Sequence, residues 1–183
     1  MWRRRNKYLK LEEEIELTLH TYLKQVIFGG IDGIITTFAV VAGFSGAKET
    51  NPEMLGIGAV LLFGFSNLFG DATSMGLGNF VAERSEQKLN KGKKLKSPIF
   101  TSIATMASFI IFGLTPLIPY IVKLQFSYQF LFFISCITSL MGLTVLGIFR
   151  FILTHEKWYK SLAEVLGIGT ISALVAYFVG TFF

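Results

Sequence analysis

The clearest pattern in the sequence is a series of five long apolar stretches separated by short polar connections. A helix needs about 20 apolar residues to cross roughly 30 Å of hydrocarbon, and each stretch reaches that length. The pattern therefore predicts an all-α integral membrane protein with five transmembrane helices. The expected spans lie near residues 23–47, 54–82, 98–122, 127–149 and 162–183.

Basic residues are distributed unevenly among the polar segments. The N-terminal arm and the second and fourth connections are rich in Lys and Arg, whereas the first and third connections offer only Lys48 and Lys123. An excess of Lys and Arg marks the cytoplasmic side of a membrane protein. We therefore expect the N-terminus to be cytoplasmic and the C-terminus to be outside, with residues 23–183 forming one five-helix domain.

The arm at residues 1–22 has the periodicity of an amphipathic helix. Apolar residues follow one face, and Glu12, Glu16 and His20 recur at steps of four on another. Carboxylates and imidazole are suitable ligands for iron, manganese or zinc, so this face is a possible cytosolic metal-collecting surface. A solvated face on a helix that continues into the first span explains the same pattern.

Composition narrows the function classes. Apolar residues make up 52% of the chain, which agrees with a membrane protein, and no stretch brings together a nucleophile, a base and an orienting group, so we expect no enzyme activity. The single cysteine, Cys136, excludes an intrachain disulfide. The loop from Lys88 to Lys96 is suited to contact anionic lipid head groups or to fix the topology, and we expect no nucleic-acid partner.

The first span contains one carboxylate, Asp32, in an otherwise apolar segment. An ionised acid in hydrocarbon is expensive unless it faces a partner, a cavity or an ion. Small residues accompany it and let helices approach closely, so we expect helix packing at these positions. They are Gly29, Gly33 and Gly43 in the first span and Gly78 in the second.

The second span carries a matching acid. Asn67, Asp71 and Met75 are spaced by four and form one stripe, and Asp71 lies at a depth similar to that of Asp32. Two carboxylates brought close in a low-dielectric setting cannot both stay ionised cheaply, so they must share a proton or a metal. The Met75 thioether would favour a transition metal over magnesium or calcium.

Several segments together carry a resemblance to a known family. They are GGIDGIITTFAVVAG at 29–43, DATSMGLGNFVAERSE at 71–86, the G-x-x-P-L-x-P-Y pattern at 113–120 and LGIGTISALVAYFVG at 166–180. In these segments the chain resembles the vacuolar iron transporter family. The resemblance implies a homodimer that exports ferrous iron or manganese from the cytosol against protons, along a path lined by the first two helices of both subunits.

Carried over position by position, Asp32 and Met75 match the metal-pathway Asp and Met of that family. Asn67 stands where plant-like members have a Glu, and Asp71 lies one turn closer to Met75.

Family members often insert a cytosolic metal-binding domain rich in Glu and Met after the second span. Only the short segment at residues 84–98 occupies that place here, flanked by Glu83 and containing Glu86. Together with Glu12, Glu16 and His20, these two acids are the candidate metal-collecting residues.

Two functions follow. The first is export of Fe²⁺ or Mn²⁺ from the cytosol by exchange with protons, with the metal as substrate and no permanently bound cofactor. The second is a non-transporting membrane docking module for a cytosolic metal-storage or metal-delivery protein. The expected membrane is the cytoplasmic membrane of a prokaryote or a vacuole-type membrane of a eukaryote.

Overall fold

The computed structural model describes residues 2–50, 56–89, 97–122, 126–154 and 157–182, with side chains described outside 2–21, 48–50 and 153. Helices account for nearly all of these residues. They are α1 (Trp2–Thr50), α2 (Ile57–Leu89), α3 (Pro98–Gly113), the 3₁₀ turn η1 (Thr115–Leu117), α4 (Ile118–Ile121), α5 (Tyr128–Thr154) and α6 (Trp158–Thr181).

Among the described residues, five helical segments are long and apolar enough to cross a membrane. This confirms the expected all-helical membrane fold. Several helices run beyond the apolar stretches, because polar residues such as those near the end of α2 are good helix formers. The segments are Tyr22–Ala47, Ile57–Leu89, Pro98–Ile121, Tyr128–Ile152 and Trp158–Thr181.

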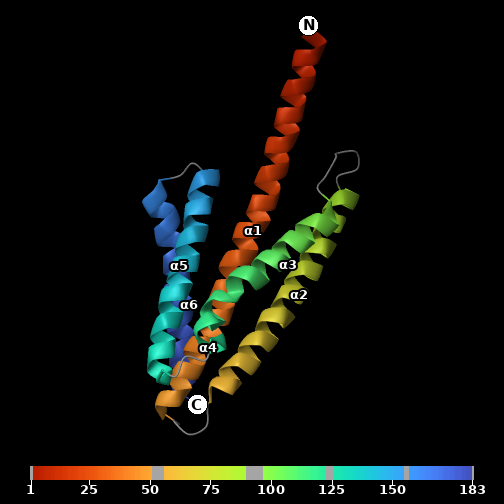
Figure 1. The fold of residues 1–183 in the computed structure, drawn as a ribbon. Helices are drawn as coiled ribbons and strands as arrows, with labels where there is room; N and C mark the ends of the chain where they lie inside the picture. The colour runs from red at the N-terminus through yellow and green to blue at the C-terminus, as the bar shows by residue number, and fades with distance from the viewer. Residues whose placement is uncertain (1, 51–55, 90–96, 123–125, 155–156, 183) are drawn as a thin grey trace.

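Helix α1 is the central element of the bundle. Helices α2 and α3 lie on one side of it, and α5 and α6 lie on the other (Figure 1). The N-terminal part of α1 extends past the other helices at the end where α2 and α5 finish and α6 begins (Figure 1). We call this end the basic end, because Arg84, Lys88, Arg150, Lys157 and Lys160 lie near it.

Glycines bring two helices against the backbone of α1. A Cβ at Gly29 or Gly33 would meet the backbone of α3 at Thr105 or Phe109, and a Cβ at Gly46 would meet the backbone of α6 at Tyr177. The third glycine of the expected packing set in α1, Gly43, would place its Cβ 3.5 Å from the Ala176 carbonyl oxygen of α6, which is ordinary contact. Small residues at helix contacts are typical of membrane bundles, where close van der Waals packing replaces the hydrophobic effect.

A buried hydroxyl joins three helices near the basic end. Thr105 Oγ1 of α3 donates to Gln25 Oε1 of α1 over 3.0 Å and accepts from Asn79 Nδ2 of α2, also over 3.0 Å. Thr105 and Gln25 are buried. Interhelical hydrogen bonds of this kind average about 0.6 kcal/mol in a membrane protein, so their main effect is to fix how α1, α2 and α3 are positioned.

Prolines shape the end of the third span, as the sequence indicates. Helix α3 ends at Gly113, and the chain continues through η1 and α4, which contain Pro116 and Pro119. The Pro116 carbonyl accepts a hydrogen bond from Ser135 Oγ of α5 at 2.7 Å. The break is therefore stabilised by a neighbouring helix, as expected where backbone groups are released inside a membrane.

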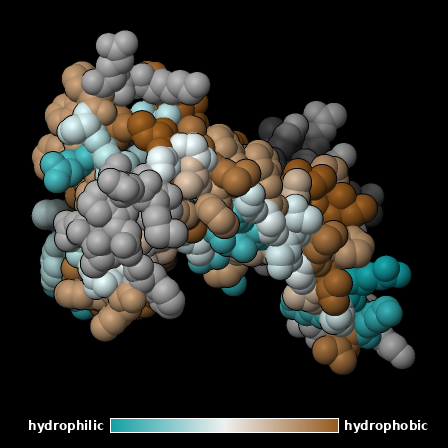
Figure 2. All heavy atoms as spheres, turned by 90° about the horizontal axis from the view of Figure 1, so that it is seen from below, coloured by the Kyte–Doolittle hydropathy of each residue, from teal (hydrophilic) through white to brown (hydrophobic). Residues whose placement is uncertain are grey.

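Apolar side chains remain exposed on the outside of the bundle. Figure 2, seen from the end opposite the basic end, shows brown apolar residues over much of the molecule and teal side chains in a few places. Examples are Ile111 at 63% exposure, Met141 at 64% and Ile171 at 65%. Such a surface suits lipid, because lipid tails solvate these side chains.

The glycine packing gives a first prediction. We expect Gly33→Ala to lower the free energy of unfolding by about 1–3 kcal/mol, because the added methyl overlaps the Phe109 backbone, which cannot move aside as a flexible side chain would. The measurement is the unfolding transition of purified protein in detergent.

Gly167→Ala is the matched control, since a Cβ at Gly167 of α6 has nothing within 4 Å. It should leave stability unchanged or raise it slightly, because alanine favours helix. Equal stability of the two variants would show that the α1–α3 contact is not as tight as described.

Candidate metal-pathway site

Asp32 lies half-buried on α1, inside the first span. Its backbone carbonyl accepts a hydrogen bond from Thr36 Oγ1 at 2.9 Å, so this threonine bonds its own helix and not the carboxylate. Within the described part of the chain, no hydrogen bond or ion pair to the Asp32 carboxylate is present. The side chain therefore keeps its capacity to bind a cation.

Asp71 of α2 is brought near Asp32. The two carboxylates are close enough for their charges to repel each other, although they are 39 residues apart in the chain. Asp71 is half-buried, and Asn67 Nδ2 donates a hydrogen bond to Asp71 Oδ2 at 2.9 Å. Two of the three residues in the α2 stripe are thus in direct contact, and the expected pairing of the two spans through their acids is present.

Met75 lies one turn from Asp71 and is also half-buried. It packs against the apolar core formed by residues such as Leu68, Ala72 and Phe109. Core packing explains the partial burial of the Met75 side chain. One turn of helix separates Met75 from Asp71.

The site in one chain has few ligands. No group of three or more His, Cys, Asp or Glu side chains that could hold a metal occurs among the residues whose placement is described. Divalent transition metals take four to six ligands, and hard oxygen donors such as carboxylates are acceptable to Fe²⁺ and Mn²⁺. Asp32 and Asp71 are two carboxylates, fewer ligands than such a metal takes, so a metal held there would need further ligands from water or another chain.

Asp32 also lines an open cavity of about 710 Å³ between α1, α5 and α6. Lys24, Arg150 and Glu164 lie in the same lining, and Arg150 of α5 forms an ion pair with Glu164 of α6. The sequence pattern does not single out Lys24, Arg150 or Glu164 as site residues. These three charges lie near the ends of different spans, and their sequence positions alone do not indicate that they line one cavity.

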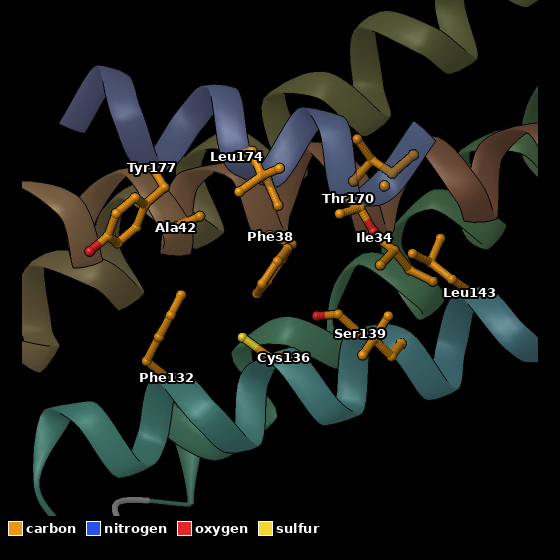
Figure 3. Close-up of a pocket in the computed structure, with 14 residues that line it drawn as sticks. Ile34, Phe38, Ala42, Phe132, Cys136, Ser139, Leu143, Thr170, Leu174 and Tyr177 are labelled. Carbon is orange, nitrogen blue, oxygen red and sulfur yellow. The ribbon is translucent and has the colours of Figure 1, made fainter. Parts of the chain in front are cut away.

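A second cavity, of about 380 Å³, is different in character. In Figure 3 the Cys136 thiol and the Phe38 ring point into the space between α5 and α6. No carboxylate lines it, and its hydroxyls at Ser139 and Thr170 bond carbonyls of their own helices. This cavity is apolar and has no ligand set for a cation.

Only two of the five candidate metal-collecting residues, Glu83 and Glu86, have described side chains. Glu83 is 8% exposed on the buried side of α2, whereas Glu86 is exposed. The side chains of Glu12, Glu16 and His20 lie outside the described residues, as does most of the lysine-rich loop, at 90–96.

Gly78, the fourth glycine of the expected packing set, faces open space among the residues whose side chains are described. A Cβ there would have nothing within 4 Å, and the same holds for Gly70, two turns earlier on α2.

The polar residues that join α1, α2 and α3 through Thr105 were not identified from the sequence, because isolated Gln, Asn and Thr residues in a span carry no distinctive spacing.

Comparison with known proteins shows the family to which the chain belongs. Over residues 23–94 and 86–181 the chain matches the family model described as "VIT family". It is 43% identical over 77 residues to a vacuolar iron transporter of Toxoplasma gondii, which covers 42% of this chain and 24% of the relative. It is 23% identical over 189 residues to vacuolar iron transporter homolog 4 of Arabidopsis thaliana, covering 94% of this chain and 91% of the relative.

A vacuolar iron transporter of Plasmodium falciparum is 39% identical over 72 residues. The matches span about a quarter of the length of the Toxoplasma and Plasmodium relatives. No solved structure matches the chain. The family model covers nearly the whole helical bundle, including both acids, and on this ground the chain belongs to the VIT family.

Proposed function

We propose that this protein exports Fe²⁺ or Mn²⁺ from the cytosol in exchange for protons, along a path lined by α1 and α2 at the interface of a homodimer. One observation carries the proposal. Asp32 and Asp71 come from different membrane spans, are each half-buried, and lie close enough to repel each other. A cation between them removes that repulsion, and a proton does so in its absence.

The names of the relatives support iron as substrate. The Toxoplasma and Plasmodium proteins are both vacuolar iron transporters, and the stretches they share with this chain cover 42% and 39% of this chain. Manganese shares the preference of ferrous iron for carboxylate oxygen, so the same pair of acids suits both ions.

The exposed surface of α2 supports a dimer. An exposed row of small residues runs along α2 at steps of four. Rows of small residues let two membrane helices approach closely, and twofold pairing is the commonest arrangement of identical subunits. The row consists of Ser66, Gly70, Ser74, Gly78 and Ala82.

The orientation follows from the charges at the basic end. Helices α2 and α5 end there, beside the N-terminal part of α1, and α3 and α6 begin there (Figure 1). The positive-inside rule assigns such an end to the cytoplasm. Asp32 is then reached from the cytosolic side, and the C-terminus of α6 faces the compartment that receives the metal.

The central prediction concerns Asp32. We expect Asp32→Asn to lower metal-driven proton flux in liposomes by about tenfold or more, because losing about 1.4 kcal/mol of cation binding already costs a factor of ten. The flux is followed with a pH-sensitive dye inside the vesicles after adding Fe²⁺ or Mn²⁺ outside. Circular dichroism of the same sample checks that the helical fold is kept.

Thr144→Val is the control for that experiment. It removes a hydroxyl of α5 that bonds the Leu140 carbonyl of its own helix, away from the two acids, so flux should be unchanged. Full flux in Asp32→Asn would rule out the proposed path. Metal binding without flux in the unaltered protein would instead favour the non-transporting docking module.

The dimer gives a separate prediction. We expect Gly78→Leu to convert the dimer to monomer in mild detergent, because the new side chain would fill the space in which a second α2 approaches. Light scattering coupled to size-exclusion chromatography reports the mass of the complex.

Gly167→Leu is the matched control, because Gly167 is also open within the chain but lies on α6. It should leave the dimer intact. A monomeric unaltered protein that transports metal in nanodiscs would show that the interface is not required.

A further inference from the structure

The cavity beside Asp32 contains too many charged groups to be filled by lipid. Lys24, Asp32, Arg150 and Glu164 all line it, within a bundle whose outer surface is apolar. Ionised groups at membrane depth are found facing protein partners or water-filled cavities, because hydrocarbon cannot solvate them. The charges of this lining therefore favour water.

The cavity begins at the basic end and runs inward. Along α1 its lining extends from Lys24 to Ile35, about 16 Å of helix, and along α6 from Glu164 to Ser172, about 12 Å. Lys24 and Glu164 are exposed, whereas Asp32 lies two turns deeper than Lys24 and is half-buried. The polar groups thus lie at the mouth and near the deep end, with apolar residues between them.

Asp32 lies between this cavity and the second acid. It lines the cavity with residues of α5 and α6, and it also interacts electrostatically with Asp71 of α2. A cation that crosses the cavity would reach Asp32 first and Asp71 next.

We propose that this cavity is a water-filled vestibule, one in each subunit, through which divalent cations reach Asp32 from the basic end. Glu164 is the first carboxylate on the route, and its ion pair with Arg150 keeps it neutralised until a cation arrives. This inference rests on the proposed function for the identity of the cation, but the presence of water and the effect of the ion pair can be tested without transport.

Cysteine labelling tests the vestibule. In a Cys136→Ala background, Ile168→Cys places a thiol in the cavity lining, and Ile171→Cys places one on the same helix outside both cavities. Their native side chains are similarly exposed, at 55% and 65%. The probe is the membrane-impermeant cationic reagent methanethiosulfonate ethyltrimethylammonium, added to inside-out vesicles so that it meets the proposed cytoplasmic face.

We expect Ile168→Cys to react about tenfold faster than Ile171→Cys, because the reagent attacks thiolates in water and a thiol facing lipid stays protonated and unreached. Equal, slow labelling of both would show that lipid fills the cavity and would overturn the proposal. Equal, fast labelling would show that α6 is generally accessible and would overturn it as well. A transport-inactive protein that labels as expected would leave the vestibule standing and count only against export.

The ion pair is tested in the Ile168→Cys protein with the same reagent. Arg150→Gln removes a positive charge and should speed labelling about threefold, whereas Glu164→Gln removes a negative charge and should slow labelling by a similar factor. The reason is that one charge near the route changes the local concentration of the cationic reagent. Arg150→Lys keeps the charge and should label at the original rate.

The neutral reagent methyl methanethiosulfonate separates charge from shape. Its rate depends on the accessibility and acidity of the thiol but not on attraction of a cation, so the ratio of the cationic rate to the neutral rate should rise in Arg150→Gln, fall in Glu164→Gln and stay constant in Arg150→Lys. Parallel changes with both reagents would show that the substitutions alter the cavity itself and would refute the electrostatic role of the pair.

Discussion

Close backbone contacts along α1 determine which side of this helix remains for function. At Gly33 the backbone of α3 occupies the place where a side chain would be, and at Gly46 the backbone of α6 does so. In lipid there is little hydrophobic force between helices, so such contacts are the main means of holding a bundle together. They fix α1 between two pairs of helices and leave the Asp32 carboxylate half-buried, in the lining of the cavity between α1, α5 and α6.

The electrostatic arrangement follows from that packing. Asp71 has one amide donor, from Asn67, and Asp32 has none among the described residues. One donor offsets only part of the repulsion between two acids, because hydrogen bonds to a charged group contribute about 1.5–3 kcal/mol each. A cation bound between the two acids would offset the repulsion that remains. The proposed site would hold a divalent ion without enclosing it, which suits passage better than storage.

Much of the fold could be predicted from the sequence, because span length and charge depend on local composition. The nearness of Asp32 and Asp71 was also predictable, since equal depth and opposite direction leave few alternatives. The Arg150–Glu164 pair was not, because each residue alone is an ordinary charge near a helix end. The same limit applies to Thr105 and Gln25, which are 80 residues apart, and to Glu83, whose burial depends on which face α2 turns toward α3.

The length of α1 has a mechanical consequence. Its 49 residues form one helix of about 74 Å, more than twice the thickness of the hydrocarbon layer. Proline is absent from it, and the glycines at 29 and 33 are held against α3, so the usual causes of a sharp kink are missing or restrained. The part of α1 beyond the bundle is therefore rigidly connected to the spanning segment. A sideways force on that part would tilt or rotate the segment that carries Asp32.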